Sequence, residues 1–160
     1  MIKIVGDILF SDGSFDIGYG VGSLIKKGYD PFNKLERKEK DFWIGNFECV
    51  CCNTSNQKGV YYKQFRIEPE SLSHIKHLDM YGVSNNHVMQ HGGKAFKEML
   101  EYFENNNIQF VGSENKRTNV FEHQGKKIGV LSFSQRPEIF SKKPLYWSLP
   151  EYKDIEIEIN

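Results

Sequence analysis

Short apolar runs separated by polar segments set the pattern along most of the chain. Each run spans about four residues, is rich in β-branched or aromatic side chains, and is bounded by glycine, asparagine or charged residues. Runs of this kind predict buried strands. We expect the first strand to close in a turn at Gly6-Asp7. The strands are placed at residues 2–5, 42–45, 80–83 and 108–111.

One segment has a clear helical period. Phe96, Met99, Leu100 and Phe103 recur every three or four residues, which predicts an amphipathic helix that follows two glycines and ends at residues 105–107. Three shorter helices are expected from apolar spacing, from a charged stretch and from acidic residues at a helix start. They cover residues 21–25, 36–40 and 68–78.

The other segments read as extended chain. Residues 61–67 alternate enough for a strand or an extended segment, and residues 120–123 and 127–133 flank Gln124-Gly125 like a hairpin. Isoleucines alternate with glutamates over residues 155–159, as in an edge strand. Strands that alternate with helices predict an α/β fold.

Composition and charge narrow the classes of function. A chain of 160 residues with 39% hydrophobic residues is expected to form a single domain, over residues 1–160, with its own core. Lys plus Arg equals Asp plus Glu at 21 each, which gives no basic excess for binding nucleic acid. We therefore expect a small-molecule or polymer substrate and no nucleic-acid partner.

The compartment follows from the N-terminus and the cysteines. No apolar run approaches the roughly 20 residues that span a bilayer, so we expect no transmembrane segment and no signal peptide. Cys49, Cys51 and Cys52 are odd in number and too close together for a disulfide framework, and they are expected to pack beside the second strand. Both observations predict a cytoplasmic protein.

Polar side chains follow three of the predicted strands. Asp7 follows the first, Glu48 the second, and Asn85, Asn86 and His87 the third. Because ligands bind at the carboxyl ends of parallel strands, these side chains are expected to meet. Carboxylates, an amide oxygen and an imidazole suit a divalent metal such as Mn, Mg, Fe or Zn. In the alternative interpretation the same residues are turn or helix caps and solvated loop residues.

The order of these groups resembles the CapA family of poly-γ-glutamate capsule proteins. The resemblance rests on three elements in the same order and at comparable separations, together with residues 68–70 and 110–113, and it runs from about residue 2 to residue 133. The three elements are Gly6-Asp7-Ile8-Leu9, Asn46-Phe47-Glu48-Cys49 and Ser84-Asn85-Asn86-His87.

The resemblance implies a fold and a set of roles. The fold is the calcineurin-like metallophosphatase sandwich, in which a mixed sheet is flanked by helices and the metals lie at strand ends. Asp7 and Glu48 would be metal carboxylates and Asn86 an oxygen ligand. His87 would protonate the leaving group or contact phosphate, and Asn85 would support the others.

Two departures from the family pattern matter. Gln90 stands where the family has an aspartate three residues after the histidine, so a local hydrogen bond is expected to be lost. The histidines of the family's second half do not occur in this sequence, and a clamp for two metals needs more ligands than Asp7, Glu48 and Asn86. His91 is the candidate substitute ligand or substrate contact; alternatively, it shapes the entry to the following helix.

Two functions of different classes follow from this resemblance. In the first, the protein acts in capsule or exopolysaccharide synthesis and hydrolyses a phosphoester or a related bond with a bound metal. In the second, it is a truncated or split module that binds a partner without turnover. An incomplete sandwich would expose an apolar sheet face, so a homo-oligomer or a complementing chain is the expected partner.

Overall fold

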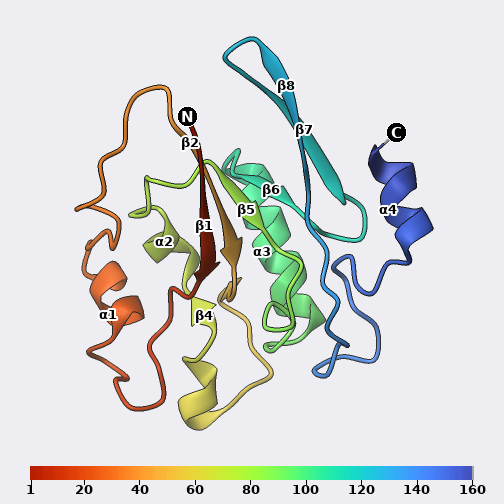
Figure 1. Cartoon of the computed structure of the whole chain (residues 1–160). Coiled ribbons are helices and arrows are strands. Elements are labelled where there is room, and N and C mark those ends of the chain that lie inside the picture. Colours follow the sequence, from red (N-terminus) through yellow and green to blue (C-terminus); the bar gives the residue numbers. More distant parts are fainter. Residues whose placement is uncertain (160) are drawn as a thin grey trace.

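A four-stranded parallel sheet runs through the centre of the protein in the computed structural model, which describes residues 1–159 (Figure 1). Its strand order is β1-β2-β5-β6, so the four apolar runs do form strands as predicted. Parallel neighbours need crossover connections, each of which carries a helix here, and the predicted α/β class is confirmed. The strands are β1 (Ile2–Ile8), β2 (Phe42–Phe47), β5 (Met80–Gly82) and β6 (Gln109–Val111).

The first strand is longer and more exposed than predicted. The turn expected at Gly6-Asp7 is wrong, because β1 continues through a bulge between Val5 and Asp7 and stays paired with β2 up to Ile8. As an edge strand it is only partly buried, and Ile4 is 79% exposed. The bulge re-aims the chain so that Asp7 lies opposite Asn46 of β2.

Helices cover one face of this sheet and form the main core with it. The predicted helix α3 (Gly93–Asn105) buries Phe96, Met99 and Phe103. The rings of Phe47, Tyr81 and Phe103 meet with centroids 5.2 to 5.8 Å apart, a favourable separation for aromatic pairs. The same core takes in side chains from α1 (Val21–Lys26) and α2 (Pro69–Leu72).

The opposite face of the sheet is only partly covered. The predicted hairpin is confirmed as β7 (Thr118–His123) and β8 (Lys126–Leu131), and Phe121 stacks on Phe42 at a centroid distance of 4.0 Å. A cavity of about 690 Å³ separates the hairpin from the rest of this face. The arrangement fits an incomplete α/β sandwich. Antiparallel pairing of named strands is confined to the hairpin among residues 1–159, and cover by a second copy or a complementing chain stays a prediction.

Two of the predicted short helices differ from the structure. Residues 36–38 have no regular structure and residues 39–40 form a turn, because the Asp41 carboxylate accepts the Lys38 N–H and the Lys3 side chain binds the Glu36 carbonyl. The helix that starts at Pro69 ends at Leu72 instead of reaching Leu78. Just beyond it, the Ser73 hydroxyl donates to the Glu70 carbonyl, and such side-chain bonds to the backbone compete with helix continuation.

Two predicted extended segments also differ from the structure, the first in part and the second entirely. Residues 61–67 contain the end of a 3₁₀ helix, η1 (Gly59–Tyr62), and only β4 (Arg66–Ile67) is a strand, paired with β3 (Val50–Cys51). The end of the chain forms helix α4 (Tyr152–Ile159). No partner strand lies beside α4 among residues 1–159, and a helix satisfies its backbone groups internally.

Two expectations concern the whole chain. The single domain predicted over residues 1–160 includes Asn160, which lies outside the described residues. Within residues 1–159, no helix combines the length and the apolar character needed to cross a bilayer.

Candidate functional site

The polar side chains predicted to meet lie at the carboxyl ends of three adjacent strands. β1, β2 and β5 are neighbours in the sheet and run in the same direction, so their ends share one edge. Asn46 of β2 bridges the first two strands, because its side-chain amide donates to Asp7 Oδ1 at 2.7 Å. The sheet itself therefore fixes one oxygen of Asp7, and no bond to the second oxygen occurs within residues 1–159.

Glu48 directly follows β2 and is held by its backbone. Its N–H donates to the Ile8 carbonyl at 3.0 Å, while its half-buried carboxylate makes no hydrogen bond or ion pair within residues 1–159. Burial raises the pKa of Glu48, and the negative charge of Asp7 raises it further; the charges of His87 and Arg136 act in the opposite direction. Asp7, His87 and Arg136 thus lie within electrostatic reach of Glu48.

Asn85 is buried at this strand end, and its side chain links several backbone and side-chain groups. Its side-chain amide nitrogen donates to Asn46 Oδ1 at 3.1 Å and to the Phe47 carbonyl at 2.9 Å. Its Oδ1 accepts the N–H groups of His87 and Val88 at 3.0 and 3.1 Å. All of its hydrogen-bonding capacity is directed into the protein, which fits the supporting role implied by the family resemblance.

Asn86, the next residue, has a different environment. It is half-buried, and its side chain makes no hydrogen bond within the part of the chain that the structure describes. An amide oxygen in that state can bind a ligand without breaking an internal bond. The two neighbouring asparagines are therefore separated by geometry into one structural and one available side chain.

His87 is held between an aromatic ring and an amide. The Phe65 ring stacks on its imidazole with a centroid distance of 3.8 Å and an interplanar angle of 4°. Gln90 Oε1 lies 3.0 Å from Nδ1, which assigns the Nδ1 proton and leaves Nε2 as the nitrogen for chemistry. The expected loss of a local bond at Gln90 is wrong, since glutamine supplies it, although as a neutral group.

His91 does not join this cluster. It is only 2% exposed, and its Nδ1 and Nε2 lie 2.6 Å from the Ser55 hydroxyl and the Gln64 carbonyl, respectively. Burial lowers the pKa of His91 and so favours the neutral ring, in which Nε2 donates to the Gln64 carbonyl and Nδ1 accepts from the Ser55 hydroxyl. Both nitrogens are occupied in linking three segments, so its role as a ligand or substrate contact stays a prediction that this geometry does not favour.

The donor set suits one divalent ion in type, although it is not closed. Asp7 and Glu48 offer carboxylate oxygens, Asn86 an amide oxygen and His87 a ring nitrogen, a mixture that hard or borderline ions accept. Within residues 1–159, however, no three His, Cys, Asp or Glu side chains are gathered closely enough to hold a metal. The described residues do not supply the coordination shells of a two-metal clamp.

The cysteines beside this site are inert. Cys49, Cys51 and Cys52 are free and buried. Burial raises the pKa of Cys49 and of Cys52 to about 12, so neither thiol is ionised near neutral pH. They pack beside the second strand as predicted and add no ligand to the strand ends.

Sequence reasoning missed two residues of the site. Arg136 lies beyond β8, outside the matched motifs, and no local pattern marks it as a neighbour of Glu48. Phe65 was included in a predicted extended segment, but its φ of +51° falls in the left-handed region, which is uncommon for a bulky residue. A backbone outlier that places a ring on a candidate catalytic histidine has no signature in the sequence.

Comparison with known proteins agrees with the resemblance found in the motifs. The family model described as "Bacterial capsule synthesis protein PGA_cap" matches residues 1–156, nearly the whole chain. A search of curated proteins gave no significant match.

Proposed function

The chain belongs to the family of bacterial capsule synthesis proteins, and from this premise we propose that it serves poly-γ-glutamate-type capsule or exopolysaccharide synthesis through a metal-dependent, phosphoesterase-like site at the strand ends. One observation carries the proposal. The half-buried Glu48 carboxylate has no hydrogen-bond or ion-pair partner among residues 1–159, and the charges of Asp7, His87 and Arg136 all act on it. Burying a carboxylate without a partner is costly, and a bound cation would offset that cost.

Each residue of the site has a defined part in this proposal. Asp7, Glu48 and Asn86 would hold a divalent ion such as Mn, Mg, Fe or Zn, which when bound activates water and polarises a substrate oxygen. His87, oriented by Gln90 and Phe65, would carry a proton on each ring nitrogen and give the one on Nε2 to the leaving oxygen, while Nδ1 keeps its proton on Gln90. Arg136 would attract the negative charge of the substrate.

A second function is favoured by a different observation. Because the described residues do not gather a closed metal cage, a non-catalytic module that binds a ligand or a partner chain on the same fold is the alternative. The cytoplasm is the proposed location for either function, supported by the three free cysteines of the described chain.

Calorimetric titration of the metal-free protein with Mn²⁺ tests the first function against the second. We expect saturable binding that is lost in Glu48→Ala and retained in Glu101→Ala, an exposed glutamate of α3. An Mn²⁺-dependent hydrolysis of bis(p-nitrophenyl) phosphate should disappear with the same variant. Absence of binding in wild type and variant alike would refute the metal site and leave the binding module.

A further inference from the structure

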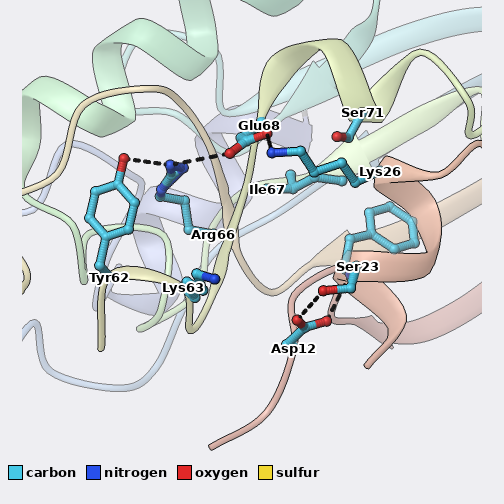
Figure 2. A pocket seen from close by; sticks show the side chains of 11 residues that line it. Asp12, Ser23, Lys26, Tyr62, Lys63, Arg66, Ile67, Glu68 and Ser71 are labelled. Carbon is cyan, nitrogen blue, oxygen red and sulfur yellow. Dashed lines mark hydrogen bonds and ion pairs between the residues drawn. The ribbon is translucent and has the colours of Figure 1, made fainter. Parts of the chain in front are cut away.

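A small basic pocket is lined by side chains of α1, η1, β4 and α2 and of the segments next to them (Figure 2). Its volume is about 110 Å³, and its lining includes three cationic and two acidic side chains. None of these residues belongs to the strand-end site described above. The charged lining residues are Lys26, Lys63, Arg66, Asp12 and Glu68.

Arg66 is the buried centre of this pocket. Its side chain is 5% exposed, and the guanidinium lies 4.1 Å from the centre of the Tyr62 ring. Nη2 donates to the Tyr62 hydroxyl at 2.7 Å and Nη1 to the Cys52 carbonyl at 3.2 Å, so the planar group is rigidly placed. Nε is buried and has no hydrogen-bond partner within residues 1–159. A buried charged group with an open donor is unfavourable unless an acceptor arrives.

The charges around Arg66 are only partly compensated. Glu68 approaches Nη2 no closer than 4.0 Å with Oε1, and its Oε2 pairs with Lys26 at 2.6 Å (Figure 2). Asp12 is already satisfied: burial raises its pKa, but bonds from the Ser23 side chain and from the Gly18 and Ser23 N–H groups outweigh this and lower it. Three cations against two carboxylates leave the pocket net positive.

We propose that this pocket binds one oxyanion group, a phosphate or a carboxylate, at the Arg66 guanidinium, with Lys63 and Lys26 completing the charge. A guanidinium edge matches the paired oxygens of either group, and a volume of about 110 Å³ suits a single such group. Glu68 competes with an incoming anion, because its carboxylate pairs with Lys26 and lies near Arg66. The site does not depend on the proposed hydrolase.

The pocket and the strand-end site use residues that are adjacent in the sequence. Arg66 directly follows Phe65, whose ring stacks on His87, and the Phe65 N–H is held by the Ser11 hydroxyl at 2.9 Å. One short segment thus contributes a residue to each site. A substrate carrying more than one acidic group has the right chemistry to use both.

Titrations of the metal-free protein at constant ionic strength test the pocket. Inorganic phosphate and glutarate are the two probes. A Kd of about 1 mM for one of them identifies the class of oxyanion that the pocket binds. Lys63→Gln should weaken that binding several-fold, whereas Lys58→Gln, an exposed lysine outside the pocket, should leave it unchanged. Glu68→Gln should tighten it by about threefold to fivefold, since it removes the internal competitor.

Three outcomes would overturn the inference. The first is no saturable binding of either probe, and the second is equal binding by wild type, Lys63→Gln and Glu68→Gln. The third is loss of binding in Arg136→Gln, which would place the anion at the strand ends. Binding that survives Glu48→Ala keeps this result separate from the fate of the hydrolase proposal.

Discussion

The two ends of the parallel sheet carry the same kinds of residues in opposite states. At the amino ends, the Arg37 guanidinium donates two hydrogen bonds of 2.7 and 2.9 Å to the Asp79 carboxylate, which also accepts the Trp43 N–H at 2.7 Å. Nearby, Asp30 accepts the Phe32 N–H and lies 3.1 Å from Nδ1 of His77. Asp79 and Asp30 both have internal partners, and so does Asp41, which binds Lys3.

At the carboxyl ends, the functional groups are left open. Glu48 and Asn86 make no side-chain hydrogen bonds within residues 1–159, Asp7 uses one oxygen, and His87 uses one nitrogen. Saturated groups contribute stability, whereas open groups cost stability and are retained where a ligand completes them. The difference between the two ends therefore separates the scaffold from the candidate site more clearly than residue type does.

The largest effect is expected at the amino ends. Asp79→Ala leaves the Arg37 guanidinium and the Trp43 N–H without their shared acceptor, so the free energy of unfolding should fall by about 3 kcal/mol. Urea denaturation measures the change, with Glu101→Ala on the exposed face of α3 as the control. A loss as small as that of the control would mean that the saturated network does not stabilise the sheet.

The two adjacent asparagines bring the comparison inside the site. Asn85→Ala removes a buried side chain with four hydrogen bonds and should cost about 2 kcal/mol. Asn86→Ala should stay within about 0.5 kcal/mol, because its amide has no internal partner in the described chain. Equal losses in denaturant midpoint would contradict the division into a supporting and an available residue.

The sequence predicted those parts of the fold that local pattern determines. The four strands of the sheet, α3 and the hairpin each have a periodicity or a turn that specifies them. The alternating isoleucines near the end of the chain predicted a strand but form α4, since strand formation depends on a neighbour that the alternation cannot reveal. The same dependence explains why the bulge in β1 was missed.

The sequence indicated which residues lie at the strand ends, but not which of their side chains have hydrogen-bond partners. The rule that parallel strands share a carboxyl edge placed Asp7, Glu48 and His87 at neighbouring strand ends, where the charges of Asp7 and His87 act on Glu48. Which groups are open depends on contacts from distant segments, such as Phe65 on His87 and Arg136 near Glu48. Those contacts join residues far apart in the sequence and leave no motif.

A smaller effect is expected at the histidine. Gln90→Leu removes the partner of His87 Nδ1 and should cost about 1 kcal/mol, while Gln90→Glu keeps an acceptor at the same place and should cost less. If the hydrolase proposal holds, Gln90→Leu should also lower kcat at least tenfold with little change in KM, because the ring loses its orientation. Unchanged kcat in an active enzyme would remove Gln90 from its positioning role.

The smallest change is expected at Glu48 and should be stabilising. Burial and Asp7 raise its pKa above the ordinary 4.5, so the folded state binds the proton more tightly than the unfolded state. Stability is then lost as the pH rises from the unfolded pKa through the folded one. Glu48→Gln has no such loss. Its free energy of unfolding should match that of the wild type near pH 4 and exceed it by about 0.5–1 kcal/mol at pH 7.

Urea denaturation of the metal-free proteins at both pH values measures this difference. An advantage of the variant that is the same at both pH values would show that the open carboxylate is not its source. Saturating Mn²⁺ should make the wild type the more stable protein at pH 7, because only its Glu48 carboxylate can bind the cation and be stabilised by it.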